Sequence, residues 1–354
     1  MASGDPVDAP AAAAEPMEVE ADQCLDLTSC QLHDLSEVEI PPTLEELDLT
    51  ANRLAAVDPR IGRLPGLRKL SFRQNLLDDA AVAPLSTWAD IAGLQELVFR
   101  DNKLTTIPDA SIFKGLLVFD VSFNEISSLK GLSKVSSTLK ELYVSKNEVA
   151  KMEELEHFHA LQILELGSNR LRVSSLQCIL SSTSQSSDGK SRNLGKSARA
   201  MAGKKSNQDN QPMWFESNKK IKLAKQQTDF NEWVTIHCSL IQECIALEEL
   251  YLSHNGIQKM EGLSTLQNLR VLDVSSNKLT AIEDVETLSR LEDLWLNDNQ
   301  IPSLDGIESA LASSREKLTT IYLERNPCAK APNYSSTLKT IFPNLEQLDS
   351  DMLA

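Results

Sequence analysis

The chain lacks every motif that would indicate a familiar catalytic centre. Its 354 residues contain no phosphate-binding GxxxxGK[ST] loop, no GxSxG nucleophile elbow and no HExxH metal-binding helix. Histidine is scarce, with five residues, and no nucleophile has an adjacent base. We therefore expect no catalytic residues, no metal and no cofactor, and we predict that the protein is not an enzyme.

Clustered metal ligands are equally scarce. His237, Cys238 and Cys244 lie near one another, but a zinc site would need two tight ligand pairs. Core or incidental residues explain this group better than a metal site does. His157 and His159 fall on a predicted convex turn and have no evident partner.

Long apolar runs and a dense cysteine framework are also missing. No stretch of 18 apolar residues exists, so no membrane span is expected, and Ala11–Ala14 is too short for a secretory signal. The six cysteines are scattered, which favours reduced thiols in an intracellular compartment. The net charge of −16 opposes nonspecific binding to nucleic acid or anionic membrane and favours basic partner surfaces.

What the chain has in abundance is a leucine repeat. Residues 269–290 carry the frame L-x-x-L-x-L-x-x-N-x-L, and the frame returns along nearly the whole chain at intervals of 22 to 27 residues, with one longer interval of 86. The repeat asparagines are Asn52, Asn75, Asn102, Asn124, Asn147, Asn169, Asn255, Asn277, Asn299 and Asn326. With an earlier unit at 25–32, this pattern predicts eleven units of an α/β leucine-rich-repeat solenoid. Such a fold has a curved parallel sheet on its concave face, short helices and 3-10 turns on its convex face, a C-terminal cap and here a disordered insertion.

The asparagine has a physical role at this position. Its amide can donate to and accept from backbone groups that would otherwise be buried unpaired where the chain leaves the strand. In the first unit Cys30 occupies the same slot, and we expect its small thiol to be buried there.

The organisation along the chain follows from where this period holds. We predict a disordered acidic tail at 1–22, repeats 1–7 at 23–173, a Ser/Lys-rich irregular insertion at 174–237, repeats 8–11 at 238–326 and a cap at 327–354. The tail is either a solubilising segment or one that steers the chain toward a basic partner. A weak helical pattern over 233–247 predicts re-entry into the solenoid.

Two longer elements interrupt the repeats. Residues 78–91 have room for a convex helix with Trp88 turned inward. In the cap, Asn333 is a candidate N-cap of a helix that Pro343 ends, and Leu345 to Asp349 predicts a half strand.

The outward face of the strand row carries the candidate site. Its central column alternates carboxylates with large aromatic side chains, and the column beside it is acidic. Aromatic residues dominate binding hot spots, and carboxylates select a basic partner. The predicted partner-binding residues are Asp120, Tyr143, Glu165, Tyr251, Asp273, Asp293, Trp295 and Tyr322. The alternative is that single exposed aromatics are ordinary and the acids only solvate the surface.

At these residues the chain resembles a known family. The 22-residue repeats, the Asn326-Pro327 exit and the cap through Leu348-Asp349 are similar to the leucine-rich-repeat regulatory subunit of the type-1 protein serine/threonine phosphatase, over about 25–173 and 245–354. The resemblance implies a non-catalytic subunit of nucleus and cytoplasm whose concave acidic and aromatic row holds the phosphatase catalytic subunit. The alternative is a general assembly scaffold for cytoskeletal, ciliary or ribonucleoprotein partners.

The insertion departs from that family's continuous array. Eighty-six residues separate Asn169 from Asn255, which suggests alternative splicing or a misjoined gene model in which repeat units were overwritten. Lys204-Lys205 and Lys219-Lys220-Ile221-Lys222 are either nuclear import signals or parts of a solvated loop.

Overall fold

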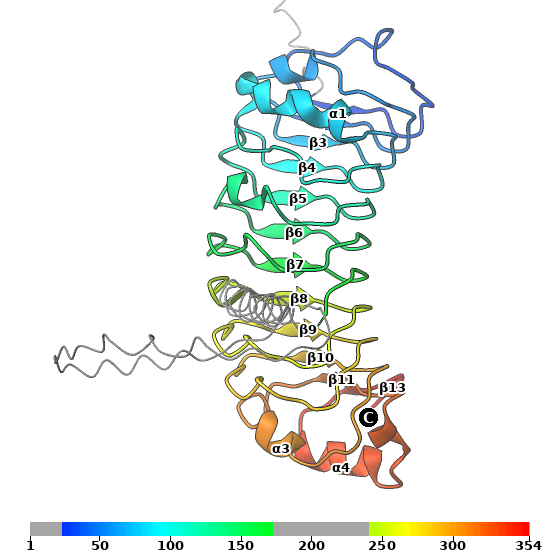
Figure 1. Ribbon diagram of the computed structural model, residues 1–354, viewed down its shortest axis with the longest axis vertical. Helices are drawn as coiled ribbons and strands as arrows, with labels where there is room; N and C mark the ends of the chain where they lie inside the picture. The colour runs from blue at the N-terminus through cyan, green and yellow to red at the C-terminus, as the bar shows by residue number, and fades with distance from the viewer. Residues whose placement is uncertain (1–22, 173–240, 354) are drawn as a thin grey trace, which may run out of the picture.

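A computed structural model describes residues 23–172 and 241–353, and these form one continuous solenoid (Figure 1). Thirteen short strands lie side by side in chain order, the first twelve parallel and the last antiparallel. The strands are β1 (Cys24–Asp26), β2 (Glu46–Asp48), β3 (Lys69–Ser71), β4 (Glu96–Val98), β5 (Val118–Asp120), β6 (Glu141–Tyr143), β7 (Ile163–Glu165), β8 (Glu249–Tyr251), β9 (Val271–Asp273), β10 (Asp293–Trp295), β11 (Thr320–Tyr322), β12 (Gln347–Leu348) and β13 (Asp351–Met352). The predicted leucine-rich-repeat fold is confirmed.

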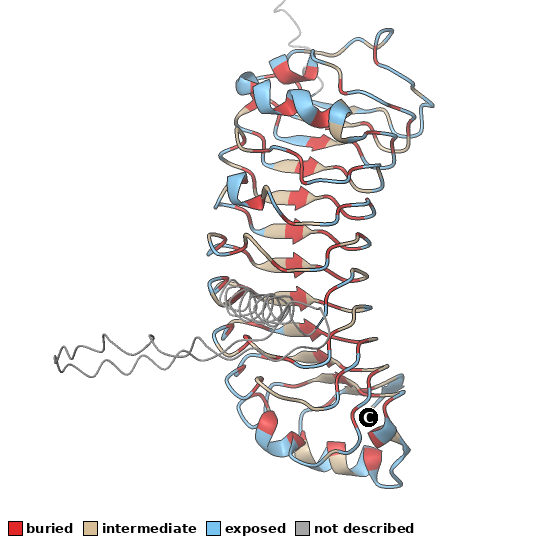
Figure 2. Cartoon of the chain, in the orientation of Figure 1, coloured by how far each residue is buried: buried red, intermediate tan, exposed pale blue. Residues whose placement is uncertain are grey.

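Alternation within each strand separates the core from the outward face. In most strands the middle residue, such as Leu142 or Leu250, is buried, whereas its two neighbours are half-buried and point the other way. On β9 the outward Asp273 is buried as well. Figure 2 shows this as a buried band running down the centre of the strand row. Because the strands pair in register, the core leucines stack on one another from repeat to repeat.

The repeat asparagines form a ladder that joins neighbouring repeats. Asn277 is typical: its Nδ2 donates to the carbonyl oxygens of Val274 in its own repeat and Leu252 in the preceding one, both at 3.0 Å. Its Oδ1 accepts from the Ile257 N–H at 3.1 Å. One buried amide thus satisfies three backbone groups, as predicted.

Cys30 does not follow the prediction of a buried thiol. It is exposed, and its Sγ donates weakly to the Thr28 carbonyl at 3.7 Å. The first repeat has no described repeat before it to bridge, so the slot has no ladder function and lies open to solvent.

The residue before each ladder asparagine adopts a left-handed conformation. Its φ lies between 52° and 59° from Ala51 through Arg325, and none of these residues is glycine. A left-handed non-glycine residue costs about 1–2 kcal/mol. The ladder hydrogen bonds offset that cost in every repeat.

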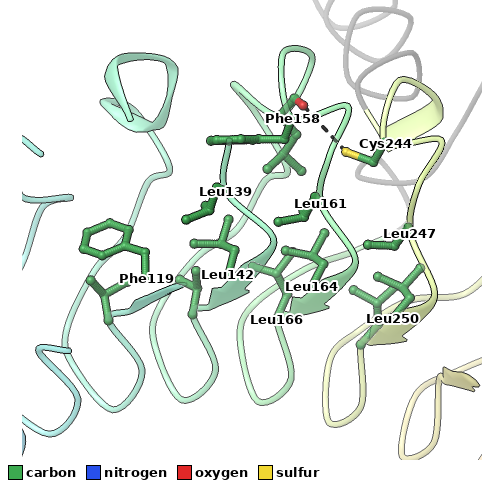
Figure 3. Packing of buried hydrophobic residues seen from close by; sticks show 14 of the residues in the cluster. Phe119, Leu139, Leu142, Phe158, Leu161, Leu164, Leu166, Cys244, Leu247 and Leu250 are labelled. Atoms are coloured by element: carbon green, nitrogen blue, oxygen red, sulfur yellow. Dashed lines mark hydrogen bonds between the residues drawn. The ribbon is translucent and has the colours of Figure 1, made fainter. Parts of the chain in front are cut away.

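The stack is continuous where β7 meets β8, a junction that we call the seam. Strand β7 pairs directly with β8, and Asn255 continues the ladder by donating to the Leu166 carbonyl at 3.1 Å and accepting from the Leu171 N–H at 2.9 Å. Figure 3 shows the core leucines passing across this seam without a break, with Cys244 donating to the Leu155 carbonyl. The insertion therefore lies between adjacent repeats of a single stack.

The convex side near the seam corrects one expectation. His159 is not without a partner, because its Nδ1 lies 3.0 Å from the Glu243 carbonyl oxygen. Of the helical pattern predicted over 233–247, the described part begins at Ile241, and Cys244 and Leu247 are buried. The predicted group of His237, Cys238 and Cys244 lies largely outside the described residues.

The remaining turns and helices lie between the strands, most of them toward the two ends of the stack (Figure 1). They are η1 (Ile61–Arg63), α1 (Asp79–Val82), η2 (Ala83–Thr87), η3 (Ala89–Ile91), η4 (Leu132–Lys134), α3 (Ile307–Ala310), η6 (Pro327–Lys330) and α4 (Tyr334–Ile341). Trp88 is buried between η2 and η3, as predicted. No helix in 23–172 or 241–353 has the length and apolarity needed to cross a bilayer.

The C-terminal cap closes the last apolar layer. Strand β12 pairs with β11, and Tyr334 of α4 donates its hydroxyl to Asp349 at 2.9 Å. Asn333 occupies the N-cap position, but its side chain makes no capping bond and donates instead to the Thr337 hydroxyl at 3.0 Å. The predicted N-cap is therefore correct in position and wrong in mechanism.

Candidate functional site

The central column of the outward face is continuous across the seam. Strand pairing aligns Asp120 with Tyr143, Tyr143 with Glu165, and Glu165 with Tyr251 on the far side of the insertion. It then aligns Tyr251 with Asp273, Asp273 with Trp295, and Trp295 with Tyr322. Asp293 lies at the start of the same strand as Trp295. We call these eight predicted residues the docking strip: Asp120, Tyr143, Glu165, Tyr251, Asp273, Asp293, Trp295 and Tyr322.

Three aromatic rings of the docking strip form one cluster. The Trp295 ring lies edge-on between Tyr251 and Tyr322, with centroids 6.4 and 5.7 Å apart. All three side chains are half-buried on the outward face. Edge-to-face contacts of this kind hold rings in fixed orientations, so the cluster presents a rigid apolar surface.

A shallow hollow of about 420 Å³ adjoins this cluster. It is lined by Trp295, Tyr322 and Asp273 together with Ser253, His254, Ser275, Asn297, Glu324 and Arg325. Asp298 holds Arg325 by a hydrogen bond of 2.7 Å from the guanidinium. His254 and Arg325 were not predicted from the sequence, because both lie beyond the strands and have a left-handed backbone conformation.

The two central aspartates have structural contacts of their own. Asp120 Oδ1 accepts from the Ser122 N–H at 2.8 Å, and Asp273 Oδ1 accepts from the Ser275 N–H at 2.9 Å. Each carboxylate therefore stabilises the turn that follows its strand, a use that needs an acceptor but no charge.

The surroundings of Asp120 disfavour its charged form. Burial raises the pKa of this carboxyl and outweighs the Ser122 hydrogen bonds and the nearby Arg100, which lower it.

Two tyrosines of the docking strip are paired with glutamates. The hydroxyls of Tyr143 and Tyr251 donate to Glu141 and Glu249, each at 2.8 Å. Burial and then the hydrogen-bonded carboxylate raise the pKa of both phenols. Each pair fixes a ring beside a negative charge, and the period of two along a strand is the signal that brings them together.

Metal-ligand clusters and free thiols are the other features that bear on the chemistry of the chain. Among the described residues, no group of three His, Cys, Asp or Glu side chains is placed to hold a metal ion. The free cysteines of this part of the chain are exposed at Cys24 and Cys30 and buried at Cys244 and Cys328.

Known proteins resemble the chain at two levels of detail. A family model described as Leucine Rich repeats (2 copies) matches residues 245–288 and 267–309. The Arabidopsis thaliana protein named Protein phosphatase 1 regulatory inhibitor subunit PPP1R7 homolog is 55% identical over 349 residues, which cover 96% of this chain and 98% of the relative. Leucine-rich repeat serine/threonine-protein kinase 1 of Mus musculus is 33% identical over 112 residues, 29% of this chain and 6% of the kinase.

Solved structures agree on the fold alone. An internalin (inlF) of Listeria monocytogenes has a TM-score of 0.56 at 16% identity, covering 94% of this chain and 87% of the internalin. The leucine-rich repeat domain of APL1B has a TM-score of 0.50 at 18% identity, covering 86% and 76%. At these identities the similarity extends to the stacked-repeat architecture and not to a partner.

Proposed function

The chain belongs to the PPP1R7 family of protein phosphatase 1 regulatory inhibitor subunits, and from this we propose that it binds the phosphatase catalytic subunit through its docking strip. In this function the chain is non-catalytic. It acts by occupying a surface of its partner, and the name of its relative favours inhibition as the outcome.

The observation that carries the proposal is the Tyr251–Trp295–Tyr322 ring cluster set among carboxylates. Rigid half-buried aromatics bury large areas at little entropic cost, and they are the residues that dominate binding energy. The adjoining half-buried Asp293 selects a basic partner surface, and Asp273, although only 6% exposed, adds negative charge beneath it.

The docking strip is also large enough for a folded partner. From β5 to β11 the column takes six strand steps, which at about 4.8 Å each span about 29 Å. That length suits an interface of standard size, about 800 Å² on each partner. The continuity of the sheet across the seam keeps both halves of the strip on one surface.

Titration of the purified catalytic subunit with the full chain and its variants tests the proposal. We expect Trp295→Ala to weaken binding by about 2 kcal/mol or more, which is about 30-fold in Kd. Ile245→Ala is the matched control, because Ile245 is 55% exposed but lies outside the strands. Equal affinity for wild type and Trp295→Ala would refute docking at this face.

The aspartates need a conservative substitution. Asp273→Asn keeps the acceptor for the Ser275 N–H and removes only the charge, whereas Asp273→Ala would also disturb the turn. Weaker binding of Asp273→Asn with unchanged thermal stability would show that the negative charge of Asp273 acts on the partner. Phosphatase activity measured alongside, with and without the chain, reports inhibition.

We propose further that the protein is nuclear and cytoplasmic and that alternative splicing accounts for the insertion. The lysine motifs at 204–205 and 219–222 support nuclear import, although they lie outside the described residues. Imaging a tagged Lys219→Ala, Lys220→Ala, Lys222→Ala variant tests the first point, with loss of nuclear signal expected. Sequencing transcripts of the locus tests the second, and finding only transcripts that encode 174–237 would contradict it.

A further inference from the structure

Within the strand columns of the outward face, basic side chains gather at one place. Three outward columns run along the described strands: the first strand residue, the third, and the residue two positions beyond. In these columns the only basic side chains are Lys69, Arg73 and Arg100, all on or just after β3 and β4. Lys69 is paired with Glu46 at 2.7 Å, which leaves the two arginines as the unusual feature.

Arg73 and Arg100 lie on neighbouring chain segments, and little negative charge balances them. The Gln74 N–H donates to the Arg100 carbonyl at 2.8 Å, so the chain segments carrying Arg73 and Arg100 run as neighbours at strand spacing. Among the described residues Arg73 forms no ion pair within 4 Å, and Arg100 is paired only with Asp120, at 4.0 Å. Both guanidinium groups act electrostatically on this one carboxylate, so one negative charge serves two positive ones. Like charges on adjacent strands are destabilising, so this arrangement favours an anionic group that lies between them.

A stacked pair of phenylalanines lies beneath the arginines. Phe72 and Phe99, the residues before them, stack with centroids 5.5 Å apart and ring planes within 2°. Every later repeat has leucine or valine at this position. Asn102 Nδ2 donates to the carbonyls of both phenylalanines, at 2.9 and 3.0 Å.

An exposed phenylalanine holds one of the arginines in place. Phe123 is 38% exposed, and the Arg100 guanidinium lies 4.3 Å from its ring centroid. Phe123 occupies the left-handed position at φ 56°, where a bulky residue is disfavoured. A guanidinium stacked on a ring keeps its N–H edge free and oriented for a carboxylate.

We propose that Arg73, Arg100 and Phe123 form a cationic end of the docking face that binds an acidic segment of the phosphatase catalytic subunit. This rests on the proposed function. The cationic end is contiguous with the docking strip, since β4 is followed directly by Asp120 on β5. The partner must then present acidic groups at one end of its contact surface and basic groups along the rest.

This polarity would determine the direction of docking. A uniformly acidic strip would accept a basic surface in either direction along the stack. A cationic end followed by carboxylates and rings matches only one direction, because the reversed complex brings like charges together.

Neutralising or reversing the charge of Arg73 and Arg100 tests the cationic end. Against the catalytic subunit, we expect Arg73→Gln with Arg100→Gln to weaken binding about 10- to 100-fold, and the double change to glutamate to weaken it further. Added salt should shrink the difference. The control is Arg290→Gln with Lys317→Gln, which makes the same charge change at exposed residues outside the strand columns.

The single variant Arg73→Gln separates an effect on binding from an effect on folding. Arg73 forms no ion pair within 4 Å among the described residues and acts on Asp120 only at longer range, so this variant should unfold nearly like wild type and still bind more weakly. Phe123→Leu should weaken binding too, since it removes the ring that orients Arg100.

Two results would overturn the proposal. Unchanged or tighter binding of the glutamate variant would mean that the partner offers no acidic group here. Residues 1–22 contain six acidic and no basic residues and could occupy the cationic end themselves. If deleting them tightened binding in wild type but not in the arginine variant, the chain's own tail would be the occupant. If Trp295→Ala also had no effect, the proposed function itself would fail; if only the arginine variants had none, the cationic end alone would.

Discussion

Replacing Asn255 by alanine would test the seam between β7 and β8. The change removes three full hydrogen bonds: from Nδ2 to Leu166 at 3.1 Å and Leu252 at 3.0 Å, and from the Leu171 N–H at 2.9 Å. It also removes a contact from Nδ2 to the Ser253 carbonyl at 3.1 Å, which must share one of the two N–H groups of the amide. Two of the three full bonds cross the seam. At about 1 kcal/mol for each bond, and more for carbonyls left buried and unpaired, the loss of unfolding free energy should be about 3 kcal/mol or more.

Asn277→Ala is the matched control, because it removes the same three kinds of bond within continuous sequence. The seam differs in chain topology, since 86 residues rather than 22 separate successive ladder asparagines there. The longer loop costs about 1.2 kcal/mol more to close. Nearest-neighbour coupling in a repeat stack then makes the seam the weakest interface.

Native-state hydrogen exchange in low urea measures the outcome directly. In Asn255→Ala we expect amides of β8 to β12 to exchange through a partial opening that leaves β2 to β7 protected. In Asn277→Ala we expect the global unfolding energy to fall without such a division at the seam. Identical exchange profiles for the two variants, with one coincident unfolding transition in each, would refute the reasoning.

Three further predictions concern charge and protonation. Asp120→Asn should raise the unfolding free energy at pH 7. The folded-state pKa of this carboxyl is raised above 3.8, so its ionisation destabilises the folded protein as the pH rises, and asparagine removes that cost. In urea melts from pH 4 to 7, the unfolding free energy of the variant should therefore depend less on pH. Tyr143 and Tyr251 should stay protonated at pH 11 in the folded chain and ionise on unfolding, as followed by ultraviolet absorbance after a pH jump. Thiol labelling mapped by mass spectrometry should modify exposed Cys24 quickly and Cys244 only after denaturation, since burial raises the pKa of the Cys244 thiol to about 12.

The repeat frame was sufficient to predict the strand register. Because leucines recur at a near-constant period and strands alternate by two, the frame around Asn124, Asn147 and Asn169 already placed Tyr143 on the outward face. The amide role of the ladder residues followed from the need to satisfy buried backbone groups, and the structure confirms it in ten repeats.

The left-handed residues and the side-chain pairs were not predictable in this way. Phe123 and His254 occupy a conformation that sequence rules assign to glycine or asparagine, because repeat stacking overrides local preference. The turn contact of Asp273 and the stacking of Arg100 on Phe123 depend on rotamers that only neighbouring strands determine. Continuity across the seam was equally hidden, since the period alone does not say which strands pair.

The pairing of β7 with β8 has a consequence for assembly. At that seam the two runs of repeats meet through hydrogen bonds and packed side chains, with 82 residues of chain between Leu166 and Glu249. Any second copy presents the same complementary surfaces, so the C-terminal run of one molecule would fit the N-terminal run of another without a new contact. At high concentration the molecule is thus suited to exchange halves reciprocally into a domain-swapped dimer that keeps every rung of its ladder.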